Sequence, residues 1–134
     1  MTTPKAKFAG LALIAALCAV FILGLTVPAS AGYDAGEAAY KRGDYATALR
    51  ELRPLAEQGN AGTQRVLGVM YGKGRGIPQD YVQAHMWYNL AASSYYPSEY
   101  RDEAVKNRDI VAMRMTPAQI SEAQKLAREW KPKK

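Results

Sequence analysis

The 134-residue chain contains a single cysteine and a single histidine. Cys18 lies in a long apolar run near the beginning of the chain, and no thiol follows it. The remainder therefore cannot form a disulfide framework, a thiolate metal site or a cysteine nucleophile. His85 has no second histidine or cysteine to act with, so we interpret it as a packing or solvent-facing residue. The sequence predicts no catalytic residue, no metal site and no cofactor.

The chain also lacks a basic patch in its main part, although its formal net charge is +6. Lys5 and Lys7 precede the apolar run, and three lysines lie in the basic tail, residues 131–134. The segment between these two ends is close to neutral. This distribution argues against a nucleic-acid-binding protein, because such a domain concentrates its positive charge on a folded surface.

The first 31 residues have the pattern of a signal peptide. Lys5 and Lys7 come before the apolar residues 8–27, and small residues at Ala29 and Ala31 form an A-x-A cleavage site. We expect cleavage after Ala31 and a protein that is periplasmic or secreted. The alternative is an uncleaved anchor in the inner membrane, because residues 8–27 are long enough to span a bilayer. In both cases the body of the protein lies outside the cytoplasm.

After residue 32, apolar residues recur three and four positions apart, and no segment sustains alternation with period two, which predicts helices throughout. Asp80 with Gln83, and Thr116 with Gln119, have the spacing of capping boxes. We expect six helices: the first two end at Gly43–Asp44 and Gly59–Asn60, the third and fourth span about 61–71 and 80–93, the fifth ends near Met113, and the sixth spans 116–130.

The loop at 72–79 contains three glycines, and Lys73 and Arg75 lie between them. Phosphate-binding loops have a similar composition, but the dinucleotide motif follows a strand, whereas this loop follows a predicted helix. Glycine also supplies the positive φ angles that a turn between two helices requires. We therefore interpret the loop as a turn.

A repeated pattern joins a small residue on one helix, a turn, and aromatic and small residues on the next helix. Its residues are Gly43, Asp44, Leu67, Gly68, Tyr71, Gly74, Gly76, Asp80, Ala84, Trp87 and Ala91. On these residues the segment 59–93 closely resembles one Sel1-like repeat, a relative of the tetratricopeptide repeat (TPR) with a longer turn. The segment 36–57 resembles a TPR-like unit. We expect Gly68 and Ala84 to let the two helices of the repeat approach closely.

The resemblance implies an all-α protein, a short right-handed α-solenoid of antiparallel helix pairs, preceded by the apolar signal helix. Each pair buries its apolar flank only against the next pair. We divide the chain into the signal peptide or anchor at 1–31, the TPR-like and Sel1-like pairs at 32–94, a degenerate closing pair at 95–130, and the basic tail. We expect this tail to be frayed.

In related repeats the first helix of each pair lines the concave side and contacts the ligand. This implies a partner-binding set in which three residues are basic and one is aromatic, a composition suited to an acidic peptide or a terminal carboxylate. The set is Glu37, Tyr40, Lys41, Arg65, Val69 and Lys73.

The sequence thus predicts an exported, non-catalytic adaptor or scaffold in the bacterial cell envelope, which binds a protein or peptide and no nucleic acid. One alternative is an envelope enzyme with weak β-lactam-binding or hydrolysing activity, as described for a cysteine-rich branch of the family, although this chain lacks that branch's paired cysteines. Another is an interaction module tethered to the membrane through residues 8–27. The sequence assigns no oligomeric state.

Overall fold

The computed structural model describes residues 29–93 and 99–134, and the predicted leader therefore lies outside the described residues, except for its last three positions. Within the described residues the regular structure is helical, with no strand. The helices are α2 (Ala29–Lys41), α3 (Tyr45–Glu57), α4 (Ala61–Lys73), α5 (Tyr81–Ala92), α6 (Glu99–Ala112) and α7 (Pro117–Glu129). No helix among these is both long enough and apolar enough to cross a membrane.

Side chains at the helix starts fix where four of the helices begin. Asp44, Asn60, Asp80 and Thr116 each accept a hydrogen bond from the backbone N–H three residues later, a donor that the helix itself leaves unpaired. Only Thr116 forms a complete capping box, with Gln119, within the described part of the chain. At Asp80 the structure contains the backbone bond from Gln83 alone, so the second capping box that we predicted is half formed.

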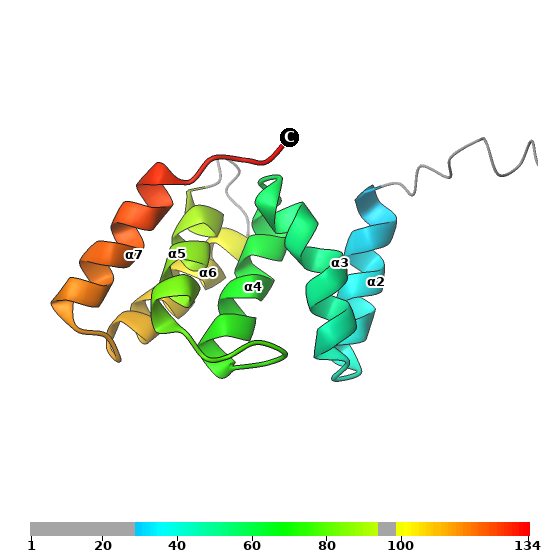
Figure 1. Ribbon diagram of the computed structural model, residues 1–134, viewed down its shortest axis with the longest axis horizontal. Helices are drawn as coiled ribbons and strands as arrows, with labels where there is room; N and C mark the ends of the chain where they lie inside the picture. The colour runs from blue at the N-terminus through cyan, green and yellow to red at the C-terminus, as the bar shows by residue number, and fades with distance from the viewer. Residues whose placement is uncertain (1–28, 94–98) are drawn as a thin grey trace, which may run out of the picture.

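The helices stand side by side and form a short helical solenoid (Figure 1). The pairs α2–α3 and α4–α5 pack closely, and α3 joins them by packing on α4. The all-helical solenoid predicted from the sequence is therefore confirmed.

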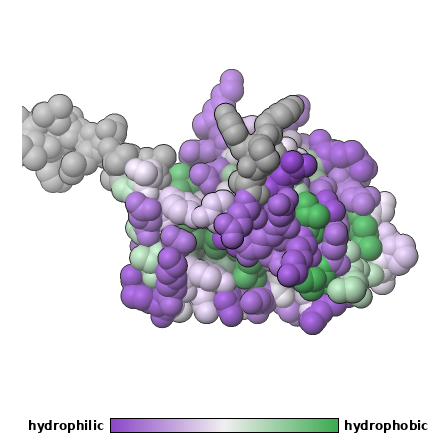
Figure 2. Space-filling model, turned by 180° about the vertical axis from the view of Figure 1, so that it is seen from behind, coloured by the Kyte–Doolittle hydropathy of each residue, from purple (hydrophilic) through white to green (hydrophobic). Residues whose placement is uncertain are grey.

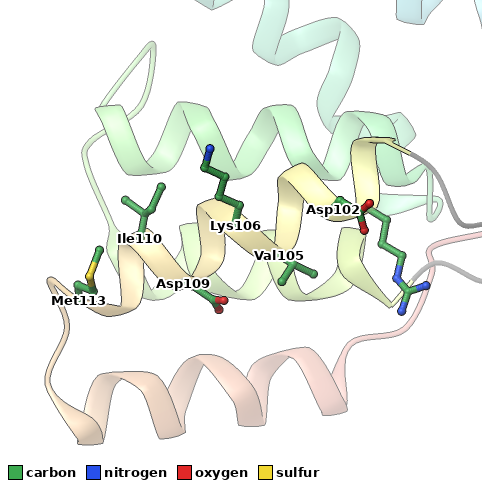
Figure 3. Close-up of a pocket in the computed structure, with 7 residues that line it drawn as sticks. Asp102, Val105, Lys106, Asp109, Ile110 and Met113 are labelled. Atoms are coloured by element: carbon green, nitrogen blue, oxygen red, sulfur yellow. The ribbon is translucent and has the colours of Figure 1, made fainter.

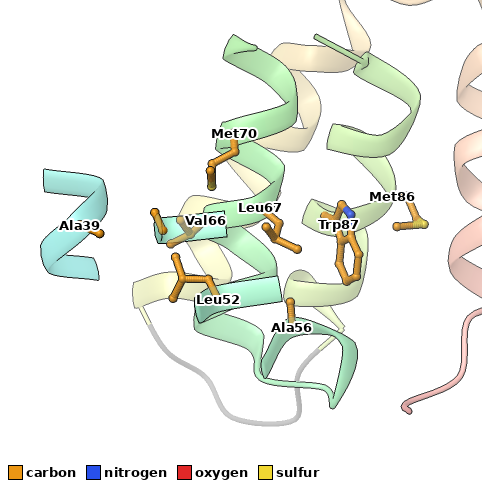
Figure 4. Close-up of a cluster of buried hydrophobic side chains, with 9 residues drawn as sticks. Ala39, Leu52, Ala56, Val66, Leu67, Met70, Met86 and Trp87 are labelled. Carbon is orange, nitrogen blue, oxygen red and sulfur yellow. The ribbon is translucent and has the colours of Figure 1, made fainter. Parts of the chain in front are cut away.

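The main core lies where α3, α4 and α5 meet. Figure 4 shows Leu52 and Ala56 of α3 lying near Val66 and Leu67 of α4, with Trp87 of α5 beside them. Leu52, Ala56 and Leu67 are completely buried. Burying a leucine side chain contributes about 1.5–3 kcal/mol, so this cluster is the main source of stability for the two pairs.

α5 is apolar on most of its surface, and α4, α6 and α7 all pack against it. A helix that is hydrophobic all round is expected to be buried on all sides. α6 and α7 hardly contact each other and instead lie against different parts of α5. The two last helices are thus consecutive, as expected for a closing pair, but each depends on α5 rather than on the other.

The end of the chain is held against the rest of the protein. Figure 1 shows the red C-terminal segment running from α7 toward the turn between α3 and α4. The Lys133 N–H donates to the carbonyl oxygen of Glu57 at 2.8 Å, and Lys133 Nζ lies 2.9 Å from Glu57 Oε2. Trp130 packs edge-on against Trp87, with ring centroids 6.5 Å apart. Our expectation of a frayed basic tail was wrong, because these contacts order it.

Candidate partner-binding groove

A hollow of about 170 Å³ lies between α2 and α4, and we call it the groove. Five of the six residues predicted to bind a partner line it. The sixth, Lys73, lies further along α4 and lines a different cavity. The lining residues of the groove are Glu37, Tyr40, Lys41, Arg65, Val66 and Val69.

Arg75 from the glycine-rich loop holds one wall of the groove in place. Its guanidinium donates a hydrogen bond of 2.6 Å to the hydroxyl of Tyr40. The same group lies over the rings of Tyr40 and Tyr45, 5.6 Å and 5.5 Å from their centroids. Such cation–π contacts favour a fixed position of the arginine over the rings. The loop therefore connects the Sel1-like pair to the TPR-like pair, a role that the sequence pattern did not indicate.

The two basic residues of the groove already have acidic partners. Lys41 Nζ lies 3.4 Å from Glu37 Oε1, one helical turn away. The guanidinium of Arg65 donates to Glu103 Oε1 at 3.0 Å and lies over the ring of Tyr100 at 5.3 Å. The Arg65 side chain is only 16% exposed. The groove is thus close to neutral, and it contains two of the three basic residues that we predicted to line it, Lys41 and Arg65.

Lys73 lines a second cavity, of about 180 Å³, where the end of α4 meets the start of α5 and the end of α6. Val69 lies between the groove and this cavity: it lines the groove and also packs in the buried cluster of Tyr88 and Val111. Both of those residues line the second cavity, so the two hollows are neighbours. The lining residues of the second cavity are Gly72, Lys73, Tyr81, Tyr88, Asn107, Ile110, Val111 and Arg114.

A third hollow follows the outer side of α6, with side chains pointing two ways (Figure 3). Lys106 and Ile110 point to the side of α4, whereas Val105 and Asp109 point to the side of α7. Ile110 and the following Met113 are exposed by 42% and 79%. The face of the molecule that carries α6 is otherwise mostly hydrophilic, with separate hydrophobic patches (Figure 2).

Two buried titratable side chains on α5 remain uncharged at neutral pH. Burial, with a further contribution from Arg108, lowers the pKa of His85 from 6.5. Burial raises the pKa of Tyr88. His85 is 4% exposed, so it is a packing residue, and its Nδ1 has no hydrogen-bond partner among the described residues. In that same part of the chain, no three acidic, histidine or cysteine side chains lie close enough together to hold a metal ion.

The model of the Sel1 repeat family matches residues 63–96. These residues are therefore similar to one Sel1 repeat. The match covers most of α4, the glycine-rich loop and the whole of α5, close to the segment 59–93 identified from the sequence pattern. Sel1 repeats are in general protein–protein interaction modules and are typically not catalytic.

A solved structure extends the comparison beyond the Sel1 repeat itself. It is the crystal structure of a protective antigen present in uropathogenic Escherichia coli strains, which displays an SLR fold. The similarity has a TM-score of 0.66 and 29% sequence identity, and it covers 76% of this chain but only 22% of the antigen. This chain therefore spans a small part of that protein's length. No curated protein matches the sequence.

The period of the α-helix explains why the groove was partly predictable. Arg65, Val69 and Lys73 are four residues apart, so they lie on one face of α4. The sequence pattern did not reveal what other parts of the chain supply: Glu103 pairs with Arg65 of the groove, and Asn107 and Arg114 line the second cavity. All three belong to the segment after the Sel1 repeat, for which we identified no repeat motif.

Proposed function

We propose that the protein is an adaptor or scaffold of the bacterial cell envelope, which binds a protein or peptide partner in the groove between α2 and α4. The observation that carries the proposal is the convergence of five predicted ligand-contact positions on one hollow. The hollow is lined by one tyrosine, two valines, the Glu37–Lys41 ion pair and Arg65, so it offers both apolar and polar contacts. This is the composition of a protein-binding surface.

The ion pairs define which surface of the partner would fit. Glu37, Lys41, Arg65 and Glu103 present both signs of charge, and each cation has an acidic partner within 3.4 Å. A strongly acidic peptide would have to displace Glu37 or Glu103 to reach these cations. The groove therefore suits a segment of mixed charge with an apolar side chain that contacts Tyr40 and Val69.

Site-specific photo-crosslinking in intact cells tests the groove. A photoreactive residue replaces Lys41 at the rim of the groove in the full-length chain, and a matched chain carries it at the exposed Arg50 of α3. We expect a discrete crosslinked product from position 41 that position 50 does not give. Glu37→Arg should abolish that product, whereas Glu51→Arg, the same charge reversal at a residue that does not line the groove, should leave it unchanged.

The same products from both positions, or a product that survives Glu37→Arg, would count against the groove as the binding surface. Arg65 is not a suitable position for charge reversal. Its guanidinium is largely buried beside Glu103, and a second carboxylate there would destabilise the fold.

We propose export on the basis of the leader sequence, residues 1–31. Cleavage after Ala31 would remove the first three residues of α2 and leave Gly32 as the N-terminus. The intact mass of the protein recovered from the cell envelope measures this directly. The mass of the full chain would favour the alternative, an uncleaved anchor, and extraction at alkaline pH would then leave the protein in the membrane fraction.

A further inference from the structure

The second cavity differs from the groove in its charge. Lys73 and Arg114 both line it, and none of its eight lining residues is acidic. Within the described residues neither cation has a carboxylate within 4 Å, whereas Lys41 and Arg65 in the groove both do. The Arg114 guanidinium makes one hydrogen bond, to the neutral hydroxyl of Tyr81 at 3.3 Å. Both side chains are exposed, so water already solvates them, and a bound anion would contact two cations that no carboxylate of the described residues neutralises.

The rest of the cavity is apolar or neutral. Val111 and Tyr88 are 8% and 4% exposed, and together with Ile110 they supply the apolar surface. Burial raises the pKa of Tyr88, so its phenol stays protonated and available as a donor. Asn107 adds an amide that can donate as well as accept. The cavity thus combines cationic and neutral donors with an apolar surface.

The size of the cavity limits what it can hold. Its volume of about 180 Å³ equals roughly six water molecules and is smaller than the roughly 300–1,000 Å³ of typical cofactor and drug sites. A nucleotide or a prosthetic group does not fit. A carboxylate joined to one short apolar side chain does fit, and this is the chemistry of the last residue of a peptide chain.

The position of the cavity gives the direction of such a peptide. Arg65, Val69 and Lys73 lie on one face of α4, the first two in the groove and the third in the cavity. A peptide that lies in the groove and follows this face toward the C-terminal end of α4 reaches Lys73 and Arg114. Figure 3 shows Ile110 on the side of α6 that faces α4, where it would contact the last side chain.

We propose that the second cavity binds the C-terminal carboxylate and final apolar side chain of the partner peptide. Lys73 and Arg114 would hold the carboxylate, and Ile110, Val111 and Tyr88 would contact the side chain. This inference rests on the proposed function, since it assigns the partner's chain end to a subsite next to the groove. Charge-assisted hydrogen bonds from two cations make such a site selective for a free carboxylate over its amide.

An NMR titration of the isotopically labelled full-length chain tests the site. The probes are N-acetyl-valine, which has the free carboxylate, and N-acetyl-valinamide, which has the same side chain but no charge. We expect N-acetyl-valine to shift the amides of Gly72, Lys73, Asn107 and Arg114 saturably at concentrations up to about 50 mM, the range of a weak single-residue ligand. N-acetyl-valinamide should bind at least about tenfold more weakly.

Two variants and one control assign the effect to the two cations. Lys73→Gln and Arg114→Gln should each weaken N-acetyl-valine binding severalfold and together abolish it. Lys106→Gln removes an exposed lysine of α6 that lines the third hollow instead, and it should leave binding unchanged. Circular dichroism and the retained amide spectrum show that each variant is folded.

Equal binding of acid and amide, shifts confined to the groove, full binding by the double variant, or no saturable shift would each overturn the proposal. The crosslinking experiment at position 41 tests binding in the groove and not in the second cavity. A negative titration with a positive crosslink therefore rejects the carboxylate site while leaving the proposed function in place.

Discussion

The ring of Tyr88 lies directly against Gly68, so closely that a Cβ on Gly68 would be 2.5 Å from Tyr88 Cε1. α4 and α5 can approach to this distance only because Gly68 has no side chain, which is the role that we predicted for it. Ala84, the other small residue in that prediction, packs instead beside Gly72, whose added Cβ would lie 3.6 Å from the Ala84 Cβ. Gly68 and Gly72 therefore meet different constraints.

This difference gives a matched pair of variants. We expect Gly68→Ala to lower the free energy of unfolding by about 1–2 kcal/mol, because overpacking against a buried ring costs more than the gain in helix propensity. Gly72→Ala meets only ordinary contact distances, so it should leave stability unchanged or raise it by up to about 1 kcal/mol. Urea denaturation of both variants makes the comparison. Equal stabilities would show that the Tyr88 ring moves aside without cost.

A second prediction concerns the C-terminal segment. Trp130 packs on Trp87 and lies over the turn at Gly59, so we expect Trp130→Ala to cost about 2–4 kcal/mol. Lys133→Ala removes an exposed ion pair while keeping the backbone hydrogen bond to Glu57, and it should cost no more than about 1 kcal/mol. Thermal unfolding measures both changes. If removal of residues 130–134 left the melting temperature unchanged, the segment would have no role in closing the core.

His85 makes stability depend on pH. Because the pKa of His85 is lower in the folded protein than its usual 6.5, the unfolded chain binds more protons than the folded protein as the pH falls below about 6.5. The stabilising contribution of the neutral imidazole is therefore present above that pH and is lost as the pH falls through the folded-state pKa.

His85→Leu removes this dependence and leaves no unpaired Nδ1 in the interior. We expect the variant to gain stability relative to the unmodified protein between pH 8 and pH 5, measured as the difference between their urea midpoints. Carboxylates titrate in both proteins and cancel in that difference. A constant difference across the range would mean that His85 is protonated equally in both states.

The glycine-rich loop provides a fourth prediction. Gly76 has φ +71°, and a Cβ there would lie 2.8 Å from Tyr45 Cβ and 3.0 Å from the Tyr45 carbonyl oxygen. Gly43 has a similar φ of +79° but open space around it. Gly43→Ala should therefore cost about 1 kcal/mol for the left-handed backbone alone, and Gly76→Ala at least about 1 kcal/mol more for the contact with Tyr45.

Urea denaturation measures the stability cost of both substitutions, and the NMR signals of the Tyr45 ring report whether the loop still contacts α3. If both substitutions cost the same, the loop can separate from α3, and Arg75 would not then hold the wall of the groove.

Much of the local structure follows from the sequence. Helix ends were predicted to within about two residues, because caps such as Asp44 and Thr116 act on backbone groups three positions away. Gly68 and the glycine-rich loop could be assigned because the Sel1 repeat has a recognisable spacing. The face of α4 that carries Arg65, Val69 and Lys73 is also a property of the sequence, since it depends only on the period of the helix.

Only the tertiary structure decides which helix each apolar face covers. α7 has an apolar face that the sequence reveals, but its position on α5 rather than on α6 depends on how the whole set of helices fits together. That position allows the tail to reach Glu57. The ion pair of Arg65 with Glu103 and the shared cavity of Lys73 and Arg114 likewise join residues far apart in the chain. No local pattern encodes such pairings, because they exist only once the burial of apolar surface has placed α6 beside α4.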